Sequence, residues 1–499
     1  MLFNSYIFIF IFLPISLIGW FGLHKIKAHV LAKLFLCAMS LWFYAYFNLH
    51  YLLIIVCSIL CNYTISFLLS KTASPSKFAK RLSLFAGLFV NLGLLFYFKY
   101  FDFFLENINS VFSKNFVLRN ILLPLGISFF TFQQLSYIID RSIGKTEHIS
   151  FPDYICFVTF FPQLIAGPIV LHTELVPQFR DSSKWTFQKD NFSKGIVLFS
   201  IGLAKKVLLA DILAVPVDFA FKSYAYLDTP TTLLTIIAYS FQLYFDFSGY
   251  SDMALGLGRM FNIFLPQNFN SPYKACSVKE LWQRWHITLS RFFIQYVYIP
   301  LGGSKKGKAR TLLNIFIVFV LSGLWHGAAW TYVAWGTMQG LLVVWDNLGI
   351  VGVKESNEKI PAKFHIPRWL GWILTYGFFD LSLFFFRSES IPAAITMLKN
   401  IADMKVTGFL PKMITKLDIP EFYFIKEAIQ LKAPSLMNTA YLLLFILLLI
   451  ISIILLRSKN ALEIVDRGIH GKTAIWISVI FVWSVISFSQ VSTFIYFNF

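Results

Sequence analysis

Long apolar segments recur along nearly the whole of this 499-residue chain, and they constrain its fold more than any other feature. A helix of about 20 apolar residues crosses the roughly 30 Å hydrocarbon core of a bilayer. Only 14% of the residues are charged, whereas an average soluble domain has roughly 25%. Backbone groups in lipid must bond to one another, so such segments form helices. We therefore predict an all-α polytopic integral membrane protein.

We expect about eleven or twelve transmembrane helices, with re-entrant or broken helices around a central tunnel. The expected spans are Leu2–Leu23, Leu31–Phe47, Tyr51–Ser70, Leu82–Tyr97, Ile121–Ile139, Phe151–Leu171, Leu312–Trp330, Tyr332–Gly349, Trp369–Phe386, Tyr441–Leu456 and Ala474–Phe494. Further apolar stretches, interrupted by Gly and Pro, lie between Ile196 and Phe264. No linker or repeat divides the chain, so we interpret residues 1–499 as one membrane-embedded domain.

The net charge of +18 is concentrated in alternate connections between the spans, at residues 25–33, 71–81, 141–145 and 305–310. Basic loops remain on the cytoplasmic side of a membrane. This rule predicts an outward-facing N-terminus and an outward-facing loop at residues 387–439. Anionic lipid headgroups account for such loops, so we expect membrane lipids as partners and no nucleic acid.

Two histidines lie in apolar, tryptophan-rich surroundings. His286 ends the motif WQRWH, and His326 is the fifth residue of the motif SGLWHG. A histidine in a helix is usually a hydrogen-bonded packing residue. Imidazole, however, takes up and releases a proton near neutral pH, and ionisable groups at membrane depth usually have a function. We therefore interpret both residues as candidate catalytic residues.

The positions of the two histidines follow from helix geometry. Ser277, with Glu280 three residues later, predicts a helix that begins near Val278 and continues past His286, close to the cytoplasmic face. If Leu312 enters from the cytoplasm, fourteen helical residues carry His326 roughly 21 Å across the membrane. The sequence thus predicts two histidines at different depths, with His326 in a cavity shaped by Gly323 and Gly327 and lined by Trp325 and Trp330.

Two further segments carry polar or helix-breaking residues. Residues 161–177 contain Pro and Gly within an apolar run, and residues 245–259 carry Asp246 and Asp252 among aromatic residues and glycines. We expect broken helices and buried carboxylates here, surrounded by protein or by a water-filled cavity. Gly256 and Gly258 lack the spacing of a phosphate loop, which favours close packing of helices through small residues.

These motifs together resemble the membrane-bound O-acyltransferase family, and within it the bacterial branch of alginate O-acetylation proteins. The resemblance rests on residues 281–290, 298–303 and 321–330, and on the motifs FKYFDFF (98–104), LPLGISFFTFQ (123–133), FFPQLIAGPI (160–169), FDFSGYSDMALGLGR (245–259) and FIYFNF (494–499). The chain departs from that branch in two places. Ile294-Gln295 replaces the usual Arg-Asp, and Cys276 stands where Arg is more common.

The resemblance implies transfer of an acyl group across the membrane, with the catalytic core of the domain at residues 120–350. By similarity, His326 is the essential base, and His286 positions or polarises the acyl group on the donor side. Acetyl-CoA is the implied donor substrate, with no permanently bound cofactor and no metal; the cofactor-binding residues are unknown. An extracytoplasmic SGNH-type acetyltransferase is the implied partner, in a bacterial inner membrane. The alternatives are a teichoic-acid D-alanyl transferase, a transporter, and a non-enzymatic assembly component of a polysaccharide export complex.

Overall fold

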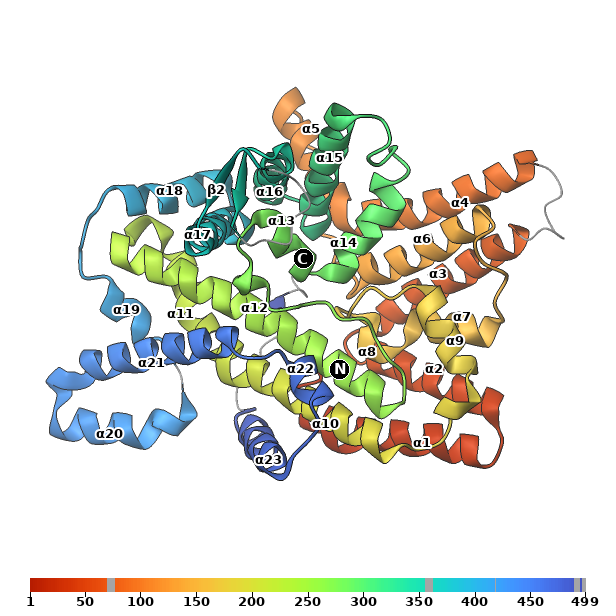
Figure 1. Cartoon of the computed structure of the whole chain (residues 1–499), viewed down its shortest axis with the longest axis horizontal. Helices are drawn as coiled ribbons and strands as arrows, with labels where there is room; N and C mark the ends of the chain where they lie inside the picture. The colour runs from red at the N-terminus through yellow and green to blue at the C-terminus, as the bar shows by residue number, and fades with distance from the viewer. Residues whose placement is uncertain (70–76, 355–361, 418, 489–493, 496–499) are drawn as a thin grey trace. The chain divides into compact units, whose positions relative to one another are not determined.

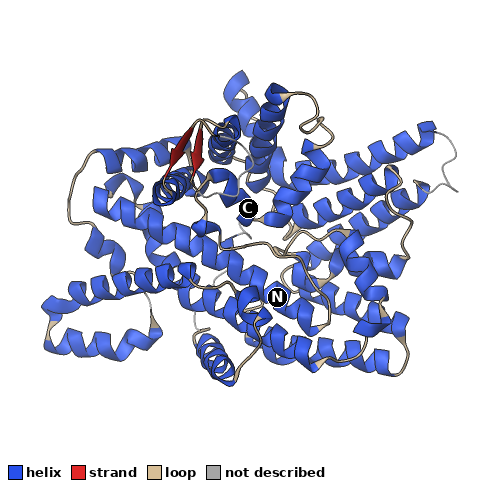
Figure 2. Ribbon diagram, in the orientation of Figure 1, coloured by secondary structure: helices blue, strands red, loops and turns tan. Residues whose placement is uncertain are grey.

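A computed structural model of the protein describes residues 1–69, 77–354, 362–417, 419–488 and 494–495. Helices make up most of this part of the chain (Figure 2). Its strands are β1 (Val351–Val353) and β2 (Phe364–Ile366), which pair in parallel. The prediction of an all-α fold is confirmed. Residues 70–76 of the second basic loop and residues 496–499 of the closing motif lie outside the described ranges.

Six helices in the described ranges are long and apolar enough to cross a membrane. They are Phe8–Lys25, Leu49–Leu68, Phe78–Phe112, Lys308–His326, Arg368–Arg387 and Pro434–Arg457. Shorter apolar helices are His29–Ala45, Ile391–Ala402 and Gly471–Ile486. The polytopic membrane class is confirmed, and the count of about eleven or twelve crossings stays a prediction.

Contacts divide the chain into two compact units, and the single-domain interpretation stays a prediction. Among the described residues, unit 1 comprises residues 1–69, 77–200 and 250–267. Its helices are η1 (Phe8–Phe12), α1 (Leu13–Lys25), α2 (His29–Ala45), α3 (Leu49–Leu68), α4 (Lys77–Leu95), η2 (Phe96–Tyr100), α5 (Phe101–Phe112), α6 (Ile127–Ser142), α7 (Phe151–Thr159), α8 (Phe161–Leu164), α9 (His172–Arg180), η3 (Ser182–Lys184) and most of α10 (Lys189–Ala204). Helices α3, α4 and α6 lie side by side (Figure 1).

Buried amides hold these three helices of unit 1 together. The side-chain amide of Asn62 on α3 donates to Oδ1 of Asn91 on α4, at 3.3 Å. Gln134 on α6 donates to the hydroxyl of Ser58 on α3, at 2.9 Å. Hydrogen bonds of this kind stabilise contacts between helices where lipid removes the hydrophobic driving force.

The expected span Phe151–Leu171 is not one helix. Helix α7 ends at Thr159, Phe160 leaves the helical region with a ψ angle of 107°, and α8 continues for only four residues. Pro162 lies in the first turn of α8, where its missing N–H costs no hydrogen bond. The broken helix predicted for residues 161–177 is confirmed, and the uninterrupted span is wrong.

In the part of the chain that the structure describes, unit 2 comprises residues 201–249, 268–354, 362–417, 419–488 and 494–495. Its elements are η4 (Lys205–Ala210), α11 (Asp211–Lys222), η5 (Tyr224–Tyr226), most of α12 (Thr229–Met260), η6 (Pro272–Lys274), α13 (Val278–Arg284), α14 (Ile287–Phe293), η7 (Ile294–Tyr298), α15 (Lys308–His326), α16 (Trp330–Leu348), β1, β2, α17 (Arg368–Arg387), α18 (Ile391–Ala402), α19 (Leu410–Ile414), η8 (Pro420–Phe422), α20 (Tyr423–Lys432), η9 (Pro434–Leu436), α21 (Met437–Arg457), α22 (Ala461–Asp466) and α23 (Gly471–Ile486). Helices α15 and α16 are antiparallel, and the contact between them is the most extensive helix–helix contact of unit 2.

The glycines of α12 serve close packing and do not break the helix. Helix α12 runs for 32 residues without interruption, so the expected break at residues 245–259 is wrong. A Cβ at Gly249 would lie 2.7 Å from the carbonyl oxygen of Gly202. Within unit 1, a Cβ at Gly256 would lie 2.6 Å from the carbonyl oxygen of Gly195. The predicted packing role of Gly256 is confirmed.

We predict that the basic loop before α15 faces the cytoplasm. A cysteine at Lys306, which is exposed, should be shielded from a membrane-impermeant thiol reagent in intact cells and react after permeabilisation. A cysteine at Lys426, an exposed lysine of α20 in the loop predicted to face outward, is the matched control and should react in intact cells. Labelling of Lys306→Cys from outside would reverse the orientation.

Candidate functional site

The first histidine lies at a break between two short helices. Ser277 caps α13 as predicted, since its hydroxyl accepts from the backbone N–H of Glu280 at 3.1 Å. The helix nevertheless ends at Arg284, and His286 has left-handed backbone angles of φ 46° and ψ 50° before α14 begins. The expected continuous helix through His286 is therefore wrong. A non-glycine residue held in this region costs of order 1–3 kcal/mol, and such strain is found mostly at functional sites.

Asn268 holds the break in place. Its backbone carbonyl accepts from the N–H of Ile287 at 3.0 Å. Its side-chain oxygen accepts from the N–H and the hydroxyl of Thr288, at 3.3 and 2.9 Å. The same oxygen lies 3.1 Å from Nδ1 of His286. The break is thus fixed by a loop that precedes it by almost 20 residues in the sequence.

These contacts also determine which nitrogen of His286 carries a proton. The N–H of Thr288 can only donate, so the atom of Asn268 that faces it is the carbonyl oxygen, an acceptor. Nδ1 of His286 must therefore donate to this oxygen. In a neutral ring the other nitrogen, Nε2, then carries a lone pair and can accept a proton or a hydrogen bond.

The ring of His286 is fully buried among aromatic side chains. Its centroid lies 4.8 Å from the ring of Phe247, 5.9 Å from Trp325 and 6.4 Å from Phe269. Burial lowers the pKa of His286 to about 3, because an apolar environment disfavours the imidazolium form. The ring is therefore neutral at physiological pH and available as a base or acceptor.

The second histidine is the last residue of α15. His326 is 2% exposed, and its ring meets Trp335 edge-on at 5.2 Å and Phe386 at 5.3 Å. These partners come from α16 and α17, so three long helices of unit 2 surround this side chain. The predicted aromatic environment is confirmed for Trp325, whose ring lies 5.0 Å from that of His326, whereas Trp330 is 59% exposed.

The structure brings the two histidines together. Their ring centroids are 6.4 Å apart, at an angle of 64°. The prediction that they lie at different depths is therefore wrong. It assumed that His286 stays near the polar segment that precedes it, but the break at residues 285–286 turns the ring inward beside the end of α15. The two imidazoles therefore lie within one cluster of aromatic side chains.

A polar chain supports the aromatic side chains around the histidines. The indole of Trp282 on α13 donates to the side-chain oxygen of Gln339 on α16 at 3.2 Å, and Gln339 donates to the hydroxyl of Ser382 on α17 at 2.7 Å. The ring of Trp282 packs at 5.7 Å against Trp335, which contacts His326. Gln339 and Asn268 were missed by the sequence analysis because each forms its contact with a residue distant in sequence.

Gly323, the first glycine of the SGLWHG motif, has a different role from the one expected. A Cβ at Gly323 would lie 2.4 Å from the carbonyl oxygen of Tyr332 and 3.0 Å from Cα of Gly336. Gly323 therefore lets the backbones of α15 and α16 approach each other. The interpretation that a side chain at this position would enter a cavity is wrong.

The two acidic residues singled out in α12 do not form part of the histidine pair. Asp246 is buried and forms an ion pair with Lys206, and its second oxygen accepts from the N–H of Ile495 at 2.9 Å. Lys206 also pairs with Asp211 at 2.8 Å. Asp252 is half-buried and belongs to unit 1. The buried charge of Asp246 is thus compensated by protein, as expected. Among the described residues no cluster of metal-ligating side chains occurs, and a metal-free reaction stays a prediction.

Comparison with known proteins identifies the family. The model of the membrane-bound O-acyltransferase family matches residues 43–386, a range that contains both histidines. The chain belongs to this family. It is 42% identical over 432 residues to the peptidoglycan O-acetyltransferase of Helicobacter pylori, which covers 81% of this chain and 80% of that protein. It is 38% identical over 405 residues to the probable alginate O-acetylase AlgI of Pseudomonas aeruginosa, which covers 80% and 74%.

A more distant relative is the teichoic acid D-alanyltransferase of Bacillus subtilis, 28% identical over 296 residues, or 54% of this chain and 70% of that protein. The resemblance drawn from the motifs is thus confirmed, and the protein is a multi-pass membrane O-acyltransferase. The transporter and the non-enzymatic assembly component are set aside. The catalytic roles of His286 and His326 stay predictions.

Gly323→Ala is expected to destabilise the protein by about 1–3 kcal/mol, because the added methyl group must push apart the backbones of α15 and α16. The measurement is the thermal unfolding of the purified protein in detergent. Gly377→Ala on α17, where nothing lies within 4 Å of a Cβ, is the matched control and should unfold at or above the parental temperature, because Ala favours a helix more than Gly does. Equal unfolding temperatures for both variants would contradict the packing role.

Asn268→Ala is expected to lower acyl transfer per folded molecule by roughly 10²-fold, the cost of misplacing a catalytic group by about 1 Å. Asn268→Asp retains the acceptor oxygen but adds a negative charge that favours the imidazolium form of His286. As the pH is lowered, the activity of this variant should therefore decline at a higher pH than that of the parent protein. Asn262→Ala is the control, because Asn262 is an equally buried asparagine of unit 1 that bonds to Thr186. Parental activity and an unshifted pH profile in both Asn268 variants would show that Asn268 does not position His286 for the reaction.

Proposed function

We propose that this protein transfers an acetyl group from cytoplasmic acetyl-CoA across the bacterial inner membrane for O-acetylation of a cell-envelope polysaccharide. The closeness of His286 and His326 within the matched region is the observation that carries the proposal. The acetyl group and the polysaccharide are inferred from the names of the two relatives near 40% identity. An alginate-like exopolysaccharide and peptidoglycan are the candidate polymers.

The reaction needs a base in a site that excludes water. As the acceptor hydroxyl attacks the thioester carbonyl, its proton passes to an imidazole nitrogen, the carbon–sulfur bond breaks, and the thiolate of CoA takes up a proton. Neutral imidazole suits the first step, and the surrounding aromatic rings limit the hydrolysis of the thioester. We assign the base role to His326, which is surrounded by α15, α16 and α17.

His286 fits a positioning role on the donor side. Its lone pair on Nε2 can accept a hydrogen bond, for example from an amide N–H of the donor, but cannot donate one to the acyl carbonyl. This tautomer is compatible with a positioning role for His286. It is not compatible with the other expected role, in which Nε2 would polarise the acyl carbonyl. We propose that the acetyl group is handed to an extracytoplasmic SGNH-type acetyltransferase, which acts on the polymer.

Transfer of D-alanine to teichoic acid is the second candidate. It is supported by the more distant relative, which aligns with about half of this chain. Acetate release from envelope glycans, compared between a deletion strain and its parent, separates the two candidates. Loss of ester-linked acetate supports acetylation, whereas loss of ester-linked alanine supports the alternative.

His326→Ala is expected to reduce acetyl transfer from labelled acetyl-CoA in membranes by roughly 10²–10⁴-fold, the usual contribution of a general base. His286→Ala should be less severe and should act more on the use of acetyl-CoA than on the acceptor. His172→Ala is the matched control, since His172 is also 2% exposed but packs in unit 1 between Tyr137 and Phe157. All three variants should accumulate in the membrane. Near-parental turnover by His326→Ala would leave a packing role for this residue.

A further inference from the structure

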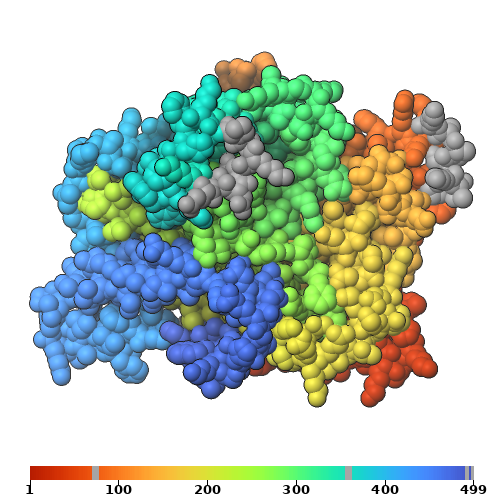
Figure 3. Space-filling model, in the orientation of Figure 1, coloured from red at the N-terminus to blue at the C-terminus, as the bar shows by residue number. Residues whose placement is uncertain are grey.

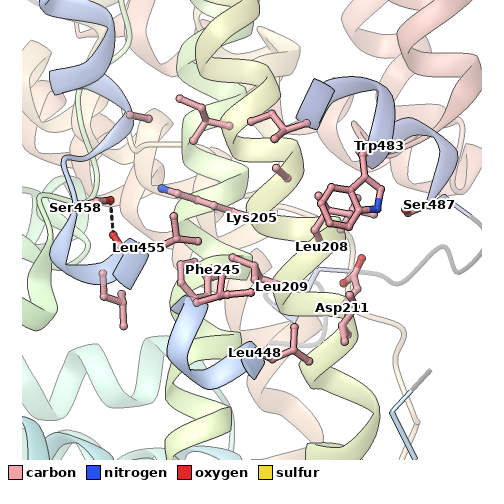
Figure 4. A pocket seen from close by; sticks show the side chains of 18 of the residues that line it. Lys205, Leu208, Leu209, Asp211, Phe245, Leu448, Leu455, Ser458, Trp483 and Ser487 are labelled. Carbon is pink, nitrogen blue, oxygen red and sulfur yellow. Dashed lines mark hydrogen bonds between the residues drawn. The ribbon is translucent and has the colours of Figure 1, made fainter. Parts of the chain in front are cut away.

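Unit 2 contains a second feature that acyl transfer at the histidines does not use. This feature is a cavity of about 670 Å³ (Figure 4). Residues 201–212 and the middle of α12 form one side of it, and the C-terminal helices α21, α22 and α23 form the other. In the space-filling view, the blue C-terminal helices do not form a continuous surface (Figure 3). The volume lies within the range of roughly 300–1,000 Å³ typical of ligand sites.

The walls of this cavity are mainly apolar. Leu208, Leu209 and Phe245 line one side, and Leu448 and Ile480 line the other. Helix α21 is a candidate membrane span, and α23 is a shorter apolar helix. In a membrane protein, a cavity with such walls suits a lipid acyl chain. A hydrocarbon chain has no hydrogen bonds to lose on entering it and gains van der Waals contacts with the walls.

The polar ends of the cavity differ in charge. At the C-terminal end of α21 the lining includes Lys459 and Lys205, and Figure 4 shows the Lys205 amine directed toward the side on which Ser458 lies. The amine of Lys274 also reaches this end, since it donates to the carbonyl oxygen of Ser458 at 2.7 Å. The lysines Lys205, Lys274 and Lys459 thus give this end of the cavity a basic character.

The acidic side chains of the lining are engaged within the protein. Asp211 forms its ion pair with Lys206 at 2.8 Å. At the opposite end of the cavity, Glu421 accepts from the indole N–H of Trp483 and from the hydroxyl of Ser487, the latter at 2.7 Å. The electrostatic preference at the lysine end is therefore for an anion.

We propose that this cavity binds an anionic phospholipid, with an acyl chain between α12 and the helices α21 and α23 and its phosphate near Lys205 and Lys459. An anionic phospholipid matches both properties of the site. Its acyl chain fits the apolar walls, and its phosphate fits the basic end of the cavity, beside the C-terminal end of α21, which also carries Arg457. The proposal depends on this cavity alone and not on the proposed function.

The test uses the full-length protein in phosphatidylcholine vesicles that contain a phospholipid with a photoactivatable acyl chain. The probe is phosphatidylglycerol, and phosphatidylcholine with the same chain is the comparison. Mass spectrometry of the cross-linked peptides should find more phosphatidylglycerol than phosphatidylcholine attached to α21 and α23. Lys459→Gln should lower the phosphatidylglycerol signal about fivefold, the effect of about one basic charge near an anionic headgroup. Lys472→Gln, at an exposed lysine in the first turn of α23 that does not line the cavity, should leave it unchanged.

Blocking the cavity separates bound lipid from lipid that merely surrounds the protein. Ile480→Trp places a large ring in the cavity and should remove the excess of phosphatidylglycerol over phosphatidylcholine labelling on α21. The neighbouring Val479→Trp, at a position that is 50% exposed and outside the lining, should retain it. Equal labelling by the two probes, or a signal that neither Lys459→Gln nor Ile480→Trp changes, would overturn the proposal. Thermal unfolding of each variant shows whether a loss of signal arises from a loss of fold, and the Lys459→Gln comparison stands if Ile480→Trp does not fold.

Discussion

The structure depends on one constraint, namely that a polar group surrounded by apolar side chains and lipid must find its partner within the protein. An unsatisfied amide or charge in such surroundings costs several kcal/mol. Unit 1 meets this constraint with the amides of Asn62 and Asn91, and unit 2 meets it with the ion pairs of Lys206. The same constraint fixes His286, because the bond to Asn268 satisfies Nδ1 and leaves Nε2 as the acceptor.

The functional site follows from this constraint together with close helix packing. Gly323 lets α15 and α16 approach each other, and their contact places Trp335 against His326. The left-handed turn at His286 then brings the second ring beside the first. The imidazoles of His286 and His326 among aromatic side chains make a site that can handle protons and limits access of water. Such a site suits a transfer from a thioester to a hydroxyl.

The sequence predicted the membrane class, the family and the two histidine motifs, because hydropathy and local motifs are read directly from neighbouring residues. It also predicted the cap at Ser277 and the close packing of Gly256. It failed where contacts between distant segments decide the outcome. The continuous helix through His286 was wrong because Asn268, 18 residues earlier, supplies the partner for a left-handed turn that helix propensity does not predict. The depth of His286 was wrong for the same reason.

The central claim is that His286 and His326 act on one acyl group in one site. The most direct test is a structure of the protein with an acetyl-CoA analogue in which a methylene group replaces the thioester sulfur, so that no transfer occurs. If both histidines act on that group, the acetyl carbonyl will lie within contact distance of both rings, with Nε2 of His286 facing the bound donor. An acetyl group bound away from both rings, or beside one ring with the other turned away from it, would contradict the account.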